Sequence, residues 1–428
     1  MTKVITYGTY DYLHYGHIRL LERAKALGDY LIVGVTADDF DKTRGKINVR
    51  QSLIERVEAV RATGLADEII VEEFEGQKID DIRKYGVDIF AIGSDWEGKF
   101  DYLSEYCKVV YLPRTEGVSS SEIRSEEQDL RILVVGEHAM ADKFIAESAY
   151  VNGVSVTGCI STREACEATN GYKKLLDESD AVYVVSEPTL RSKIAKAAIL
   201  SDKHVLIESP IATSVNDCRE LHALAKERGV IVFEALKTAF STAYHRLNLL
   251  VKGGKIGKVV SVDAVCTSLT ESPWGSLLDW GATTLLPIFQ LLGTDYREIG
   301  IHSLMAEDRK DYDVFTKLTF VYDGACASAK VGNGVKSEGE LIISGTKGYI
   351  YVPAPWWKTD YFEVRFEHAE DNKRYFYQLE GEGIRYEILE FLNSVRRGTE
   401  DAYVTGEITE AICGVMERCY EKGERKLL

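Results

Sequence analysis

Apolar and polar positions along the first 127 residues alternate as expected for strands and helices that follow one another. β-branched and other apolar residues fill short runs that we predict to be buried strands, at residues 4–7, 31–35, 68–71, 88–92 and 109–112. Two of the intervening segments, 18–27 and 51–63, carry apolar residues at helical spacing. This alternation predicts an α/β domain with a doubly wound parallel sheet, which binds ligands at the carboxyl ends of its strands.

A second alternation of strands and helices begins after a short charged joint at residues 125–129. Its apolar runs lie at 130–136, 181–185, 204–207 and 230–233, and they predict a Rossmann-like dinucleotide-binding domain over 128–236. From residue 237 onward strand-like runs dominate, at 258–268, 314–322, 340–352, 361–366 and 373–378, followed by two helices at 386–397 and 408–422. We therefore expect a third domain, 237–428, of the α+β class with a large, mostly antiparallel sheet.

Composition narrows the class of protein. The chain has 428 residues, of which 45% are hydrophobic, and a net charge of −16, which argues against nucleic acid or an anionic membrane surface as the main partner. No apolar run approaches the roughly 20 residues of a membrane span, and the amino terminus enters a strand at once. The eight cysteines form no Cys-x-x-Cys pair, so we expect reduced thiols in a cytoplasmic protein.

The most informative string follows the first apolar run. It reads Gly8-Thr9-Tyr10-Asp11, and then His14-x-Gly16-His17 at the start of the next helix. Glycines allow a backbone to approach a phosphate, and the amides at a helix amino terminus favour anions. Spacing of three residues places both imidazoles on one helix face, where they can donate to a nucleoside triphosphate. A lone histidine is usually packed or solvated, but two in this string favour function.

The string resembles the signature of the nucleotidyltransferase superfamily. Further matches at 95–101 and 109–120 resemble the glycerol-3-phosphate cytidylyltransferase branch, and the resemblance covers residues 1 to about 127. It implies a cytidylyltransferase domain that moves CMP from CTP to a phosphomonoester, with glycerol 3-phosphate favoured as acceptor, Mg²⁺ as cofactor and pyrophosphate as product. The implied product, CDP-glycerol, points to precursors of teichoic acids or capsules.

The resemblance also implies roles for individual residues. The catalytic candidates are His14, His17, Lys46 and Arg114. The nucleotide-binding candidates are Gly8, Thr9, Tyr10, Asp11, Gly16, Asp38, Asp95, Thr115, Ser119 and Ser120. Asp11 is also a candidate ligand of the metal. For Asp38, which lies close to Asp39 and Asp41, a solvated acidic loop is the alternative.

The second half, from about residue 130, resembles the Gfo/Idh/MocA oxidoreductases, through strings at 179–185, 203–210, 254–259 and 344–348. Four features of that family are altered together. The glycine-rich turn reads Gly136-Glu137-His138, and the lysine of the family's Glu-Lys-Pro string is Ser209. The proton-handling histidine and its partner acid are Thr283 and Leu286, and a further histidine is Arg191.

These changes remove the groups that would deliver a proton during hydride transfer. We therefore expect a non-catalytic scaffold; the alternative is a bifunctional enzyme whose second half is an NADP-dependent reductase that makes the phospho-polyol acceptor. Gly136, Ser161, Thr162 and Arg163 are the candidate dinucleotide site, and the last three suit a 2′-phosphate, hence NADP over NAD. An ordinary helix cap at Ser161 or Thr162 is the other interpretation. We also expect the chain to form a homo-oligomer, most simply a homodimer.

Overall fold

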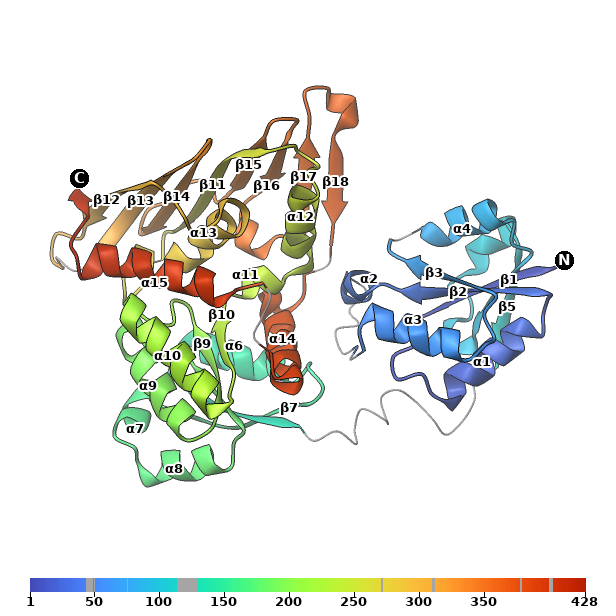
Figure 1. The fold of residues 1–428 in the computed structure, drawn as a ribbon, viewed down its shortest axis with the longest axis horizontal. Helices are drawn as coiled ribbons and strands as arrows, with labels where there is room; N and C mark the ends of the chain where they lie inside the picture. The colour runs from blue at the N-terminus through green and yellow to red at the C-terminus, as the bar shows by residue number, and fades with distance from the viewer. Residues whose placement is uncertain are drawn as a thin grey trace. The chain divides into compact units, whose positions relative to one another are not determined.

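The computed structural model describes residues 1–43, 49, 51–74, 76–113, 129–270, 272–309, 312–377, 379–399 and 403–428, without the side chains of Asp39, Lys42 and Thr43. The chain divides into two compact units, residues 1–128 and 129–428 (Figure 1). Further division of the second unit at residue 236 stays a prediction. Within the described part of the chain, no helix is both long and apolar enough to cross a bilayer.

The first unit is a five-stranded parallel sheet in the order β3-β2-β1-β4-β5. Its strands are β1 (Lys3–Gly8), β2 (Tyr30–Thr36), β3 (Glu68–Glu72), β4 (Ile89–Gly93) and β5 (Lys108–Leu112). Its helices are α1 (Tyr15–Lys25), α2 (Asp38–Thr43), α3 (Leu53–Ala62), α4 (Gln77–Tyr85), η1 (Ser94–Trp96) and η2 (Asp101–Glu105). Adjacent residues Val4 and Ile5 enter separate cores on the two faces of the sheet, which is why the strands are continuous apolar runs.

The second unit begins with another parallel sheet, in the order β10-β9-β8-β6-β7. Its strands are β6 (Leu130–Val135), β7 (Val154–Ile160), β8 (Ala181–Val184), β9 (His204–Glu208) and β10 (Val232–Ala235). The helices between them are α6 (Ala139–Ser148), α7 (Thr162–Cys166), α8 (Asn170–Asp177), α9 (Pro188–Leu200) and α10 (Val215–Arg228). This is the Rossmann alternation that the sequence predicts.

A nine-stranded mixed sheet completes the second unit, in the order β18-β17-β16-β15-β11-β14-β13-β12-β19. Its strands are β11 (Val259–Ser268), β12 (Glu298–Met305), β13 (Asp313–Tyr322), β14 (Ala325–Asn333), β15 (Leu341–Gly345), β16 (Tyr349–Val352), β17 (Tyr361–Arg365), β18 (Lys373–Phe376) and β19 (Lys426–Leu427). Within this sheet, the described strands pair in parallel only at β11–β14 and β12–β19.

Helices cover one face of this sheet, as Figure 1 shows for α13 (Ser276–Leu292) beside β11 and β14. Helix α12 (Thr242–Lys252) contacts β17, whereas α14 (Ile384–Arg397) packs against α6 and α11 (Lys237–Phe240), and α15 (Gly406–Tyr420) packs against α10 and α13. Short turns are η3 (Trp356–Lys358), η4 (Ala369–Asp371) and η5 (Gly381–Gly383). The predicted fold class is confirmed: two parallel α/β sheets are followed by a mostly antiparallel one. The single strand predicted at 340–352 is wrong, because the chain reverses between β15 and β16, where the Gly345 amide donates to the Gly348 carbonyl at 2.9 Å.

Candidate functional site

The turn after β1 holds two tyrosines in the left-handed backbone region, Tyr10 at φ 56° and Tyr12 at φ 46°. Such φ values are uncommon for residues other than glycine and often mark functional sites. The ring of Tyr10 is buried and lies over Gly8, where a Cβ would sit only 2.9 Å from Tyr10 Cζ. Gly8 therefore makes room for this ring, a reason for the glycine that differs from the expected approach to a phosphate.

His14 and His17 lie together at the start of α1. His14 is the N-cap residue, and its Nδ1 accepts the Gly16 amide at 3.1 Å, while Nδ1 of His17 accepts the His14 amide at 3.5 Å. The rings stack with centroids 3.9 Å apart, and Tyr10 packs edge-on against His17 at 5.5 Å. Because each Nδ1 is an acceptor, a neutral imidazole here carries its proton on Nε2 and can donate from that atom.

The backbone on the other side of the turn is held by polar contacts. Asp11 is buried and accepts the Gln51 amide at 3.0 Å, and Gln51 Oε1 accepts the Tyr12 amide at 2.7 Å. Thr9 donates to Asp41 at 2.9 Å. No cluster of three His, Cys, Asp or Glu side chains that could hold a metal exists among the described residues.

Sequence analysis missed Arg56, a fully buried guanidinium on α3. It donates to the carbonyls of Thr9 at 2.6 Å, Thr36 at 2.8 Å and Gln51 at 3.0 Å. It also forms an ion pair with Asp38. One side chain thus joins the ends of β1 and β2 to α3. The signal was present in the sequence: position 56 falls on the apolar helix face, between Leu53 and Val60.

Of the remaining candidate residues, the structure describes some and leaves others outside its described ranges. Asp38 accepts the Leu53 amide at 3.2 Å in addition to its contact with Arg56, which gives it a structural partner in place of a solvated loop. Asp95 is exposed in η1, next to Trp96, whose ring lies 5.1 Å from Lys99 Nζ. Five candidates lie outside the described residues: Lys46, Arg114, Thr115, Ser119 and Ser120.

In the second unit, the residues of the predicted dinucleotide-binding turn contact other parts of the protein. Gly136 has φ 143°, and a Cβ there would meet the Val185 carbonyl oxygen at 2.5 Å, so strand packing accounts for this glycine. His138 caps α6, where its Nδ1 accepts the Met140 amide at 3.3 Å, and its ring lies 5.2 Å from that of Trp274. His138 thus places an imidazole ring, and Glu137 a carboxylate, in the turn that would hold a pyrophosphate.

The residues proposed to bind a 2′-phosphate also contact neighbouring side chains of the protein. Ser161 is the N-cap of α7 and donates to Glu164 at 2.7 Å, while Thr162 is the first residue of that helix. Arg163 pairs with Glu167 at 2.8 Å on an exposed surface. Ser161 therefore acts as a helix cap in this structure, as the alternative interpretation expects.

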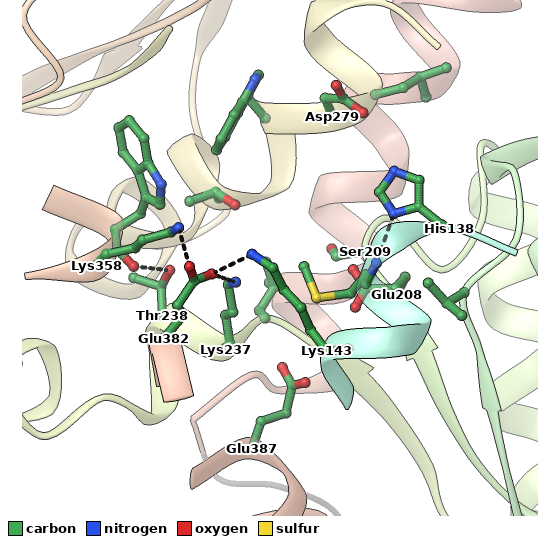
Figure 2. Close-up of a pocket in the computed structure, with 18 of the residues that line it drawn as sticks. His138, Lys143, Glu208, Ser209, Lys237, Thr238, Asp279, Lys358, Glu382 and Glu387 are labelled. Carbon is green, nitrogen blue, oxygen red and sulfur yellow. Dashed lines mark hydrogen bonds and ion pairs between the residues drawn. The ribbon is translucent and has the colours of Figure 1, made fainter. Parts of the chain in front are cut away.

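A pocket of about 300 Å³ lies near the carboxyl ends of β9 and β10, and Glu208, Ser209, Asp279 and Thr283 are among the residues that line it (Figure 2). Glu208 accepts the Tyr183 hydroxyl at 2.5 Å, and Ser209 donates to Glu234. Asp279 accepts from Asn333 at 3.0 Å, and burial raises its pKa.

Arg191, in place of a family histidine, is buried among backbone carbonyls. It donates to those of Ser186 at 2.9 Å, Pro210 at 3.2 Å and Glu208 at 3.3 Å. Burial lowers the pKa of this guanidinium, against the opposing charge of Glu208. Leu286, in place of the family acid, is completely buried. Arg191 lines the pocket, and neither Arg191 nor Leu286 can deliver a proton as a family histidine or acid would.

Two family models match the chain in succession: cytidylyltransferase-like at residues 5–126, and the oxidoreductase family with an NAD-binding Rossmann fold at 126–236. Glycerol-3-phosphate cytidylyltransferase of Bacillus spizizenii is 51% identical over 130 residues, 30% of this chain and 100% of the relative. The Staphylococcus aureus protein of that name is 47% identical over 131 residues, 29% of this chain and 95% of the relative.

The second half resembles reductases more distantly. A dTDP-3,4-didehydro-2,6-dideoxy-alpha-D-glucose 3-reductase of Streptomyces antibioticus is 27% identical over 220 residues, 48% of this chain and 67% of the relative. The 3-ketoreductase KijD10 of Actinomadura kijaniata, solved with NADP and TDP-benzene, shares the fold, with a TM-score of 0.62 at 19% identity over 70% of this chain and 99% of that one. Residues 126–236 thus match the Rossmann-fold model of the oxidoreductase family, and through its first unit the chain belongs to the glycerol-3-phosphate cytidylyltransferase family of nucleotidyltransferases.

Proposed function

We propose that residues 1–127 form CDP-glycerol and pyrophosphate from CTP and glycerol 3-phosphate. The observation that carries the proposal is the stacked pair His14 and His17, in which both Nδ1 atoms accept backbone amides. Both Nε2 atoms are therefore set as donors at the amino terminus of a helix, which itself favours anions. Family membership supports the same chemistry.

The reaction needs charge neutralisation rather than a general base. A phosphate oxygen of the acceptor, already anionic, attacks the α-phosphorus of CTP; the bond from that phosphorus to the bridging oxygen breaks, and pyrophosphate leaves with the electron pair. Catalysis then consists of positioning and stabilisation of the charge on the phosphates. We assign that stabilisation to His14 and His17, with Lys46 and Arg114 as further cations. Mg²⁺, when bound, neutralises phosphate charge.

The test is a pyrophosphate-release assay on the full chain with CTP, Mg²⁺ and a panel of acceptors. We expect the highest kcat/KM with glycerol 3-phosphate and a CDP-alcohol as product. A higher kcat/KM with another phospho-polyol would reassign the acceptor. Failure of every phospho-polyol to release pyrophosphate would disprove cytidylyl transfer.

For residues 128–428 we propose a scaffold that does not transfer hydride. The support is chemical: Ser209 stands where the family lysine would be, and Thr283 and Leu286 where a histidine and an acid would be. The reductase alternative requires NADP, which the neighbour KijD10 binds. When bound, that cofactor would supply the hydride, but the contacts of His138 and Ser161 do not favour its site here.

A further inference from the structure

Three lysines converge on one carboxylate in the pocket of the second unit. Glu382 in η5 receives Lys358 Nζ at 2.8 Å, Lys143 Nζ at 3.1 Å and Lys237 Nζ at 3.3 Å, as the dashed lines in Figure 2 show. Lys143 comes from α6, whereas Lys237 begins α11 and Lys358 ends η3. Three lysine ammonium groups surround one carboxylate, so this group of four side chains has a net positive charge.

The lysines are held together by the fold. The hydroxyl of Thr238, the residue after Lys237, donates to the Trp357 carbonyl at 3.1 Å, which fixes η3 beside α11. Burial opposes ionisation of Glu382, but hydrogen bonds from Lys358 and Lys143 and the charge of Lys237 outweigh it and lower its pKa to about 2. The three lysines therefore favour an anionic group, and Glu382 is the anion that they contact in this structure.

Glu382 is carried by an unusual backbone segment. It has φ 53°, in the left-handed region, between Gly381 at φ 56° and Gly383 at φ 93°. A non-glycine residue in this region is strained and persists where its surroundings hold it. The side chain of Glu382 is 37% exposed, so it can leave the lysines toward solvent without disturbing the core.

The floor of the same pocket holds a second independent feature. Glu387 on α14 is only 3% exposed, and its Oε2 has no hydrogen-bond partner among the described residues. Burial, and then the charge of Glu208, raise its pKa well above the ordinary value against the charge of Lys237, so the site favours the neutral carboxyl group. In Figure 2 it points from α14 toward Lys237 and the pocket. An unpartnered neutral carboxyl can donate to and accept from a ligand hydroxyl.

The aromatic walls of the pocket suit a polyhydroxylated ligand. Trp274, Trp280 and Trp357 line the pocket, and indole rings pack well against the CH faces of such compounds. The volume of about 300 Å³ is at the lower end for small-molecule sites. Cations on one side, a hydroxyl-binding carboxyl on the floor and aromatic walls together define one class of ligand.

We propose that this pocket binds a sugar or polyol phosphate, whose phosphate replaces the Glu382 carboxylate among Lys143, Lys237 and Lys358 and whose hydroxyls reach Glu387. Glu382 is then an internal competitor that occupies the site until the ligand arrives. The inference goes beyond cytidylyl transfer and does not depend on it.

The test is calorimetric titration of the full chain with ribitol 5-phosphate and glucose 6-phosphate, and with ribitol, glucose and inorganic phosphate as comparisons. Tryptophan fluorescence gives a second readout, because three of the five tryptophans line the pocket. We expect at least one phosphorylated compound to bind more tightly than its unphosphorylated form and than phosphate. Lys358→Met and Lys237→Met should each weaken binding about 10-fold, the scale of one charged hydrogen bond.

The decisive variant is Glu382→Gln, which removes the competing charge and should tighten binding at least ~5-fold. Matched controls are Lys196→Met, which breaks an exposed ion pair with Glu220, and Glu390→Gln on α14; both should bind as the unaltered chain does. Binding unchanged in both Lys358→Met and Glu382→Gln would overturn the proposal. So would binding of inorganic phosphate as tight as that of every sugar phosphate, or no binding of any probe at millimolar concentration.

Discussion

The backbone amide of His14 donates to Nδ1 of His17 at 3.5 Å, while the ring of His14 accepts the amide of Gly16. Each histidine therefore helps to orient the other through the first turn of α1. The arrangement has a double function: it caps the helix and it directs two Nε2 donors. Variants can separate these two effects.

We expect His17→Ala to lower kcat by at least ~10²-fold, the usual loss when one transition-state donor is removed. Asn is a good N-cap residue, so His14→Asn should preserve the cap of α1 while it removes the Nε2 donor. We therefore expect it to lower kcat to a similar degree. Steady-state pyrophosphate release measures both. The control is His138→Ala in the second unit, which should leave the rate within about two-fold; a rate loss of only a few-fold in His17→Ala and His14→Asn would refute the donor roles.

Gly8→Ala should lower kcat by about 10- to 100-fold. The new methyl group would lie 2.9 Å from Tyr10 Cζ, so the buried ring must move, and His17 packs against that ring. Displacements of about 1 Å in a catalytic group have effects of this size. Gly93→Ala is the matched control at the end of β4, because a Cβ there has no atom within 4 Å. Equal activity of the two alanine variants would contradict the role given to Tyr10.

Arg56→Met should destabilise the first unit by roughly 3–5 kcal/mol, since it leaves buried Asp41 without the nearby guanidinium and frees three carbonyls. Differential scanning calorimetry should show the transition of that unit at a lower temperature. Arg61→Met removes an exposed arginine from the same helix and should change stability by no more than about 0.5 kcal/mol. A similar small effect in Arg56→Met would show that the network is not needed.

The stability of the second unit should fall as pH rises from about 4.5 to 7. Burial raises the pKa of Glu234 to about 7, against hydrogen bonds from Ser209 and Thr409. Between these pH values the unfolded chain has released the proton that the folded chain keeps, so higher pH favours unfolding. In Glu234→Gln this part of the pH dependence should disappear from thermal unfolding measured at pH 5, 6, 7 and 8. Glu227→Gln, at an exposed position on α10, should retain it.

The second unit should not oxidise or reduce sugars, polyols or their phosphates at a useful rate. Carbonyl reduction needs a proton source at the oxygen, and the positions that would provide it are Ser209, Thr283 and Leu286. Absorbance at 340 nm should stay constant with NADPH or NADH and a series of phospho-ketoses. Clear turnover that is abolished in Lys237→Ala, His245→Ala or Tyr244→Phe would establish the bifunctional alternative.

The parallel strands could be predicted because residues such as Val4 and Ile5 are buried on opposite faces, which makes each strand a continuous apolar run. Helix α13 was missed, since it is apolar on most sides and contains Gly281 and Pro287, which usually interrupt helices. His14 and His17 could be found because their spacing is local. Arg56 and the contact between Lys143 and Glu382 could not, because their partners are set by tertiary structure, the latter across 239 positions.

The contacts of Glu234 limit where the protein can be divided into separately expressed parts. Its carboxyl group joins Ser209 of the Rossmann part to Thr409 of α15, near the end of the chain. A fragment that stopped at residue 236 would keep the acid and lose one of its two hydroxyl partners, and a chain shortened by its last helix would do the same. Separate expression of the two units is therefore best attempted at residue 128, and carboxy-terminal deletions should be judged first by whether they keep Thr409.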